Sequence, residues 1–400
     1  MTGRPYWPAA ELPRRLSEET VTSPRSAAST AALVRALLMQ RHRFGITRLG
    51  AVTGLDRLGL PVAQAVRPAA RSNAVSQGKG LNIMAAAASA LMECLESWAG
   101  ENVAAERQFE APAGALGEPV RALWALALSR GIDPAWDRVP LRWIEGWDLL
   151  AGCARPVPAA MVDTDYRYPS PHPALFPRTT TGLAAGTSLH GAVIHGALEV
   201  LERDATARAG RLPGFFDRFA LDPRAVAWPG SADLIARLSA AGCVIGIWAV
   251  PSPHGLPIYW CHVLEADGAG ALAPLPGEGF GCDVTHDAAL QKALLEACQA
   301  RATAIAGARE DITRRHYPDS HDRDHLARWR RFIAHPAAPL RAPTEIEPPT
   351  DAAGMLKHLL RALEAAGAGA ALVVPLVSLT EPAVEVVRLV APGLHHGPHG

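Results

Sequence analysis

Short hydrophobic runs alternate along the chain with stretches rich in glycine, proline and small residues. Such punctuation predicts many short elements joined by turns. Strand composition, rich in Val, Ile and Leu, is found in residues 45–55, 59–68, 141–150, 157–166, 244–250, 258–266, 371–379 and 383–394. Helical composition is found in residues 31–41, 121–130, 235–241 and 352–366, and in segments that end near 101, 208 and 307. The pattern therefore predicts mixed strands and helices along the whole chain.

One local plan, a small-residue loop that leads into a helix, occurs three times. A loop is predicted at residues 72–80, before a helix that continues to Glu101. Residues 180–208 repeat this arrangement, and residues 277–307 repeat it again. Because the texture is similar throughout, we expect a single large mixed domain of the α/β (α+β) class rather than a string of small domains.

Three segments are expected from the local composition. Residues 1–40 should form a loose N-terminal arm and a first helix, residues 41–394 the main domain, and residues 395–400 a flexible tail. Residues 335–349, with five prolines, are predicted to form a linker or surface loop.

Composition and charge exclude several classes of protein. With 49% hydrophobic and 20% charged residues, the chain can bury a large core, so extensive disorder is excluded. The formal net charge is zero, which argues against a nucleic-acid-binding protein that relies on bulk positive charge. The six cysteines have no metal-ligand spacing and are expected to be reduced thiols. No signal peptide or membrane span is evident, so we expect a cytoplasmic protein without a membrane partner.

The most informative polar residues are acidic and lie on three predicted helices. Ser89, Glu93 and Glu96 are spaced i, i+4 and i+7, which places them on one side of a helix. The pair Glu199 and Glu202 has an i, i+3 spacing, followed by Arg203, and the pair Glu296 and Gln299 repeats that spacing, with Arg301 nearby. Three helices thus each carry acidic groups on a background rich in Ala and Leu.

Convergence of these helix faces would crowd carboxylates into one cleft, where protons or cations must neutralise them. Carboxylate oxygens without Cys or His neighbours favour a hard divalent ion, and Mg²⁺ commonly lies between protein carboxylates and nucleotide phosphates. The hypothesis is therefore a site for a metal and a nucleotide. The alternative for each pair is a solvated helix face or an ion pair with a nearby arginine.

A second signal is the sequence Ser-Gln-Gly-Lys-Gly at residues 76–80, which includes Lys79. A small flexible loop before a helix N-terminus attracts phosphate, but such a sequence is more often an ordinary turn. The P-loop, the GxSxG elbow, HExxH and a Rossmann GxGxxG are all absent. His195 precedes Glu199 by one helical turn, so it faces either the same cleft or the core. The C-terminal histidines are expected in a polar, disordered end.

Several separated stretches, in this order, resemble the YcaO family. They are residues 45–62, residues 76–80 with Ser89-x3-Glu93-x2-Glu96, residues 181–186 with Glu199-x2-Glu202-Arg203-Asp204, residues 293–311 with Glu296-x2-Gln299-x-Arg301, and residues 386–393. The resemblance covers about residues 40–394 and implies a YcaO-like fold in which acidic helices line a cleft for ATP and Mg²⁺.

The resemblance also implies an activity, cofactors and site residues. The family uses ATP and Mg²⁺ to O-phosphorylate a peptide backbone amide, which makes loss of the amide oxygen favourable. Attack by a Cys, Ser or Thr side chain then gives an azoline, whereas external sulfide gives a thioamide, often with a TfuA-type partner. By this resemblance Glu93, Glu96, Glu199, Glu202 and Glu296 would hold Mg²⁺, and Lys79, Ser89, Arg203, Gln299 and Arg301 would contact the nucleotide.

Two departures from the family pattern affect the choice of product. Ser97 follows Glu96 where the family usually has arginine, and the chain ends without the proline-rich PxPxP tail of many azoline-forming members. The form of residues 92–101 is similar to the TfuA-associated branch, so thioamide formation is favoured. Azoline formation is the alternative, and a non-catalytic peptide-binding or scaffold subunit is the second alternative. The expected partners are a leader-bearing substrate peptide, a TfuA-like or separate peptide-recognition protein, and a second copy in a homodimer.

Overall fold

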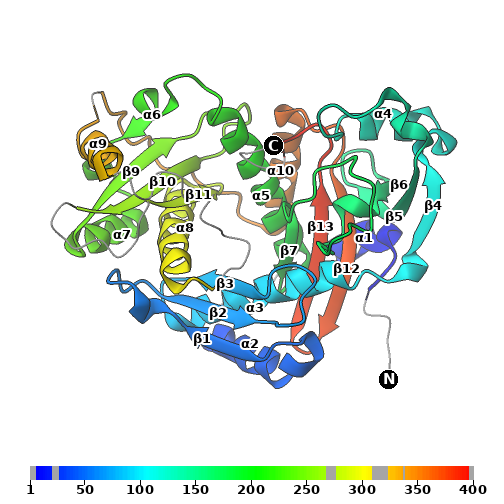
Figure 1. The fold of residues 1–400 in the computed structure, drawn as a ribbon, viewed down its shortest axis with the longest axis horizontal. Helices are drawn as coiled ribbons and strands as arrows, with labels where there is room; N and C mark the ends of the chain where they lie inside the picture. Colours follow the sequence, from blue (N-terminus) through cyan, green and yellow to red (C-terminus); the bar gives the residue numbers. More distant parts are fainter. Residues whose placement is uncertain (1–5, 20–26, 267–275, 309–322, 337, 396–400) are drawn as a thin grey trace.

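The fold consists of three β-sheets with helices packed against them (Figure 1). The computed structural model describes residues 6–19, 27–266, 276–308, 323–336 and 338–395. The strands are β1 (Arg48–Ala51), β2 (Val62–Val66), β3 (Val75–Lys79), β4 (Gln108–Pro112), β5 (Pro140–Asp148), β6 (Cys153–Pro158), β7 (Leu183–Gly186), β8 (Ala220–Leu221), β9 (Cys243–Ala249), β10 (Ile258–Glu265), β11 (Gly277–Cys282), β12 (Leu372–Thr380) and β13 (Ala383–Val390). The expected fold class, a mixed α/β domain, is confirmed.

The described helices lie on the faces of these sheets and between them. They are α1 (Leu12–Glu18), α2 (Ala27–Met39), α3 (Ile83–Glu101), α4 (Glu118–Ala125), α5 (Leu189–Ala209), α6 (Phe215–Arg218), α7 (Pro229–Ala240), α8 (His286–Ala306), α9 (Arg323–Ala334) and α10 (Ala352–Ala366). Short 3₁₀ helices, such as η1 (Ala9–Glu11) and η3 (Thr53–Leu55), lie in the connections.

Among the described residues the strands pair antiparallel, and one isolated bridge, between Leu221 and Leu340, is parallel. The sheets have the strand orders β1-β2-β3, β11-β10-β9-β8 and β4-β5-β12-β13-β7, and β6 also pairs with β5. The last strand before each of the helices α3, α5 and α8 lies at the edge of a sheet. The three sheets therefore each present one edge strand and the helix that follows it.

These three strand–helix units share their local chemistry. Each helix begins after a residue whose side chain accepts a hydrogen bond from a backbone N–H of the first turn: Asn82 for α3, Ser188 for α5 and Thr285 for α8. Glycines in the strands let the helices pack very closely. A Cβ atom on Gly78 would lie 2.1 Å from the backbone nitrogen of Ala90, and one on Gly279 would lie 2.2 Å from the Ala293 carbonyl.

The units contact one another in a ring around the centre of the molecule (Figure 1). Helix α3 contacts β7 of the second unit, α5 contacts β11 of the third, and α8 contacts β3 of the first. Large hydrophobic clusters lie behind the ring, one around Trp124 and Trp143 and another around Trp248 and Phe215. The polar faces of three helices therefore converge while their apolar faces are buried.

The structure corrects several expectations for local elements. The segments predicted as small-residue loops contain β3, β7 and β11, because glycines that suit a flexible loop also suit a strand packed tightly on a helix. Residues 6–19 of the expected loose arm contain η1 and α1, anchored by Trp7 and Leu12 in the core. His395 of the expected flexible tail is held by Asp204, which accepts bonds of 2.9 Å from its backbone N–H and its Nδ1. Residues 396–400 lie outside the described residues.

None of the helices described in the structure combines the length and the apolar composition that crossing a lipid bilayer would require.

Candidate functional site

The three units enclose a cleft of about 670 Å³. Nine of the ten residues predicted as site residues line it, and they come from β3, α3, α5 and α8: Lys79, Ser89, Glu93, Glu96, Glu199, Glu202, Arg203, Glu296 and Gln299. The volume is in the range of small-molecule sites. The structure thus brings together residues that are more than two hundred positions apart in sequence.

The acidic residues occupy equivalent positions on the three helices. Glu93, Glu199 and Glu296 each follow the helix N-cap residue by eleven positions. The residues fourteen positions after the caps are Glu96, Glu202 and Gln299. Because these positions lie on one face of a helix and the helices form a ring, the side chains meet in the cleft.

The same register places two further sets of side chains in the cleft. Seven positions after the caps lie Ser89, His195 and Lys292, and fifteen positions after them lie Ser97, Arg203 and Ala300. His195 therefore faces the cleft, which decides between the two possibilities left by the sequence. Lys292 was not predicted, although its spacing to Glu296 repeats that of Ser89 to Glu93. Each unit thus supplies one lysine or arginine to the cleft, namely Lys79, Arg203 and Lys292, but from a different position in the unit.

Each helix is tied by an acidic side chain to the strand of the next unit. Glu96 of α3 accepts a bond of 2.7 Å from the backbone N–H of Ala185 in β7. Glu202 of α5 accepts one of 3.0 Å from Cys282 N–H in β11, and Lys79 of β3 donates one of 2.7 Å to Glu296 of α8. Ala185, Cys282 and Lys79 all lie three positions before an N-cap, so the three contacts start from equivalent strand positions. The first two use a backbone N–H, whereas the third uses the Lys79 side chain.

Crowding and burial alter the acidity of the carboxyl groups. Burial raises the pKa of Glu96 well above its ordinary value, and the neighbouring charges of Glu93 and Glu199 add to this. Burial likewise raises the pKa of Glu199, although Arg203 opposes the effect. Burial raises the pKa of Glu202 to about 7, with Arg203 opposing this rise. The cleft therefore holds more negative charge than it can keep ionised without an added cation.

Glu296 is the exception among the acidic residues. Burial acts against its ionisation, but the adjacent Lys79 and the nearby Arg203 lower the pKa of this carboxyl group. The Arg203 guanidinium lies 3.9 Å from Glu199, 4.0 Å from Glu202, and 5.9 Å from the centre of the Phe280 ring. Arg203 is thus shared among the acids of two helices.

The donor set fits a Mg²⁺ ion that is completed by a bound ligand. Within the described part of the chain, no three His, Cys, Asp or Glu side chains are close enough to hold a metal ion by themselves. Mg²⁺ commonly keeps several waters and takes only one or two protein carboxylates together with phosphate oxygens. Crowded carboxylates next to Lys79, Lys292 and Arg203 supply this combination.

Arg301 does not line the cleft. Its side chain is 1% exposed and forms ion pairs with Asp56 and Glu265, both at 3.1 Å. It therefore joins α8 to the segment after η3 and to the end of β10. This position does not support the predicted contact between Arg301 and the nucleotide.

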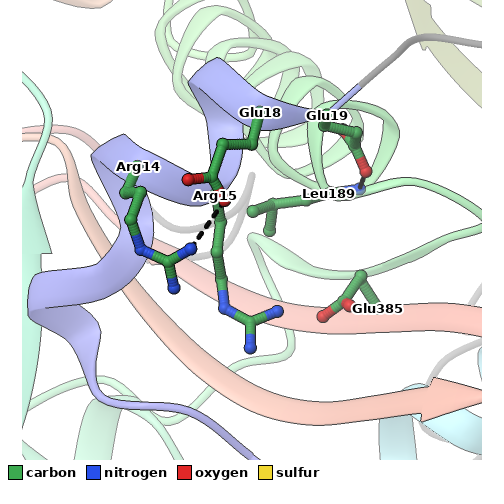
Figure 2. A pocket seen from close by; sticks show the side chains of 6 residues that line it. All are labelled: Arg14, Arg15, Glu18, Glu19, Leu189 and Glu385. Atoms are coloured by element: carbon green, nitrogen blue, oxygen red, sulfur yellow. Dashed lines mark hydrogen bonds and ion pairs between the residues drawn. The ribbon is translucent and has the colours of Figure 1, made fainter.

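A smaller cavity of about 300 Å³ lies between α1 and the start of α5 (Figure 2). Its charges are already matched, because Arg14 pairs with Glu18 at 2.6 Å and Glu19 accepts bonds from the backbone N–H groups of Leu189 and His190. Glu19 thereby satisfies free donors at the start of α5. We therefore place the candidate site in the larger cleft, where the negative charge is in excess.

Most of the chain is similar to a family of known proteins. Residues 77–395, which include the helices α3, α5 and α8, match the family described as YcaO cyclodehydratase, ATP- and Mg²⁺-binding. The chain belongs to the YcaO family. The expectation of ATP and Mg²⁺ as cofactors is thereby confirmed at the level of the YcaO family.

Relatives in the YcaO family come from distant organisms. An uncharacterised protein of Mycobacterium tuberculosis is 35% identical over 286 residues, which is 67% of this chain and 59% of that protein. The chain thus spans about three fifths of the length of this relative. An uncharacterised protein in the tfuA 3′ region of Rhizobium leguminosarum bv. trifolii is 31% identical over 278 residues, 68% of this chain and 66% of that protein.

A solved YcaO structure shares the fold. The YcaO of Methanopyrus kandleri, determined with AMPPCP and Mg²⁺, aligns with a TM-score of 0.66 at 24% identity, over 92% of this chain and 91% of that one. The expected YcaO-like architecture is therefore confirmed.

Proposed function

We propose that this protein is an ATP- and Mg²⁺-dependent enzyme that activates a peptide backbone amide by O-phosphorylation. The observation that carries the proposal is the convergence of five glutamates, at equivalent positions on three helices, beside Lys79 and Arg203 in one cleft. Excess buried carboxylate next to cations suits a metal–phosphate complex, because each part neutralises the other. The family description, which includes ATP and Mg²⁺, supports the same assignment.

The roles of the side chains follow from their charges and positions. Glu93, Glu96, Glu199, Glu202 and Glu296 would hold Mg²⁺, and bound Mg²⁺ would offset the charge of the phosphates during phosphoryl transfer. Lys79 and Arg203 would contact phosphate oxygens, and Ser89 and Gln299 would add neutral hydrogen bonds to the nucleotide. Lys79 and Arg203 already lie against Glu296 and Glu199, so nucleotide binding would exchange these pairs for phosphate contacts.

We infer that the product is a thioamide, with sulfur delivered by a TfuA-like partner. The relative encoded in a tfuA 3′ region supports this choice. In this reaction the amide oxygen leaves as phosphate and sulfide takes its place on the carbonyl carbon. The second candidate is azoline formation, favoured by the family description as cyclodehydratase, in which a Cys, Ser or Thr side chain attacks instead.

Mass spectrometry of a precursor peptide, incubated with enzyme, ATP, Mg²⁺ and sulfide, tests the proposal. Exchange of oxygen for sulfur raises the peptide mass, whereas formation of an azoline lowers it by one water. The variants Glu199→Gln and Glu296→Gln should lose at least about tenfold in activity, because each removes a metal-binding charge. Glu364→Gln, which changes an exposed glutamate on α10, serves as the matched control and should keep full activity.

Two results would contradict the assignment. Full activity in both cleft variants would show that the site lies elsewhere. Failure of the wild-type protein to bind ATP in the presence of Mg²⁺ would instead favour a scaffold subunit. The same proposal includes the remaining partners expected from the resemblance. They are a leader-bearing precursor peptide, a separate recognition protein and a second copy in a homodimer.

A further inference from the structure

A tight backbone corner at residues 179–182, just before β7, sets the orientation of Glu199. The backbone N–H of Gly182 donates a hydrogen bond of 3.0 Å to Glu199 Oε2, while the Gly182 carbonyl accepts one of 2.7 Å from the backbone N–H of Leu389 in β13. Gly182 has a φ of +81°, and a Cβ atom there would lie 2.1 Å from the Leu389 carbonyl oxygen. The position of this one backbone N–H therefore depends on how the corner is held against β13.

Arg388, the residue before Leu389, holds the same corner from inside the protein. Its Nη2 donates a bond of 2.6 Å to the carbonyl of Thr179, and its Nε donates one of 3.0 Å to the carbonyl of Met161. These two carbonyls lie at the two ends of the excursion between η7 (Ala159–Met161) and β7. A single guanidinium thus closes an irregular segment whose last residues form the corner.

The environment of Arg388 is unusual for a charged group. The residue is 3% exposed, and its Nη1 has no hydrogen-bond partner. Among the described residues, no ion pair within 4.0 Å is recorded for it. Burial of an unpaired guanidinium is costly, so two carbonyls alone do not account for its presence. The charges that act on Arg388 come from Tyr166, from Glu199 in the cleft and from Asp163, so one of the cleft glutamates is a source of compensating charge.

We propose that Arg388 is a positioning residue for the metal–nucleotide site. It acts through the Thr179–Gly182 corner, which presents the Gly182 N–H to Glu199 and so fixes the carboxylate that faces the cleft. This inference rests on the proposed function, since it assumes that Glu199 binds Mg²⁺. The group that Arg388 serves is a divalent cation carried by a nucleoside triphosphate.

Calorimetry with the full chain, titrated with AMPPCP at several Mg²⁺ concentrations and in EDTA, tests this role. Arg388→Lys keeps the charge but offers one compact head group in place of a fork, so it cannot hold both carbonyls in the same geometry. We expect the Mg²⁺-dependent affinity of this variant to fall by at least about tenfold, as for other residues that orient metal ligands. Binding of AMPPCP in EDTA should stay within about twofold of wild type.

Arg142→Lys is the matched control for this substitution. Arg142 Nη2 donates a bond of 2.6 Å to the Pro171 carbonyl, in the outer part of the same excursion and away from the corner. This variant should bind AMPPCP like the wild type in both conditions. A second variant, Gly182→Ala, displaces the corner without a change of charge and should reproduce the selective loss seen in Arg388→Lys.

The outcomes separate this inference from the proposed function. Equal Mg²⁺-dependent binding by wild type and Arg388→Lys would overturn the role of Arg388 alone. An equal loss of affinity with and without Mg²⁺ would also overturn that role, because a general structural defect would weaken binding in both conditions. No Mg²⁺-dependent binding by the wild-type chain would overturn the proposed function itself.

Discussion

At the scale of single residues, the cleft is governed by a shortage of positive charge. Glu199 and Glu202 share Arg203, and Glu296 has Lys79, whereas Glu96 is compensated by a backbone N–H from Ala185. Ser97, which occupies the position on α3 that Arg203 occupies on α5, explains this difference. The departure from the family pattern at Ser97 thus has an electrostatic consequence for Glu96, whose pKa is raised by burial and by neighbouring acids.

Substitution Ser97→Arg should stabilise the ligand-free protein. A guanidinium at this position would interact with Glu93 and Glu96, for a gain of about 1 kcal/mol in the free energy of unfolding. It should also weaken the response of stability to added Mg²⁺, because the new charge competes with the ion. Urea unfolding with and without Mg²⁺ measures both effects, and Ser97→Ala is the control. An unchanged Mg²⁺ response in Ser97→Arg would show that Glu93 and Glu96 do not bind the ion.

Residue patterns predicted most of the site but not all of it. The i, i+3 and i, i+4 spacings identified the acidic faces, because a helix fixes which residues lie together. Arg301 follows Glu296 by five residues, which turns it about 140° around the helix and away from the cleft. Helical spacing alone could therefore have placed Arg301 outside the cleft and Lys292 inside it. Arg388 could not be found in this way, because its role depends on a strand and a corner distant in sequence.

At the scale of elements, one strand–helix unit occurs three times, each with a side-chain N-cap, glycine in the strand and the same register of cleft residues. The sequence shows the repetition, but it does not show that the small-residue segments contain the strands β3, β7 and β11. Gly78 and Gly186 are compatible with loops, and only packing against α3 and α5 explains them as strand residues. The arm at residues 6–19 is ordered for a similar reason, since Trp7 and Leu12 find buried sites that composition alone does not reveal.

Close packing of β11 on α8 predicts a large effect of a single methyl group. In Gly279→Ala the new Cβ would lie 2.2 Å from the Ala293 carbonyl and 2.3 Å from the Ala297 nitrogen, so helix and strand must separate. We expect a loss of at least about 2 kcal/mol in the free energy of unfolding. Gly54→Ala is the control, because no heavy atom lies within 4 Å of its Cβ position. Equal stability of the two variants in urea would contradict the packing described here.

At the scale of the whole molecule, the ring of units gathers carboxyl groups that repel one another in the cleft where Mg²⁺ and a nucleotide are expected to bind. Glu202, whose pKa is raised to about 7, keeps its proton in the folded state at a pH where the unfolded chain has lost it. Between the ordinary pKa of glutamate and about 7, the folded protein therefore binds more protons, and stability falls as the pH rises. Above this window the cost levels off, at about 3 kcal/mol or less for this group.

The ligand-free protein should therefore unfold at a lower temperature at about pH 8 than at about pH 5.5, as far as Glu202 governs the difference. Saturating ATP with Mg²⁺ should reduce the difference, because the ion offsets the ionised carboxylates. Glu202→Gln should flatten the dependence, whereas Glu364→Gln should leave it unchanged. Melting curves across the pH range measure the dependence. If the stability of the wild type rose with pH while that of Glu202→Gln did not, the raised pKa assigned to Glu202 would be contradicted.

The most direct test of the central claim is a crystal structure with AMPPCP and Mn²⁺, with anomalous scattering used to locate the manganese. We expect anomalous peaks in the cleft, each coordinated by phosphate oxygens and by glutamates of α3, α5 or α8. Manganese bound away from these three helices, or a nucleotide bound without contact to their glutamates, would contradict it.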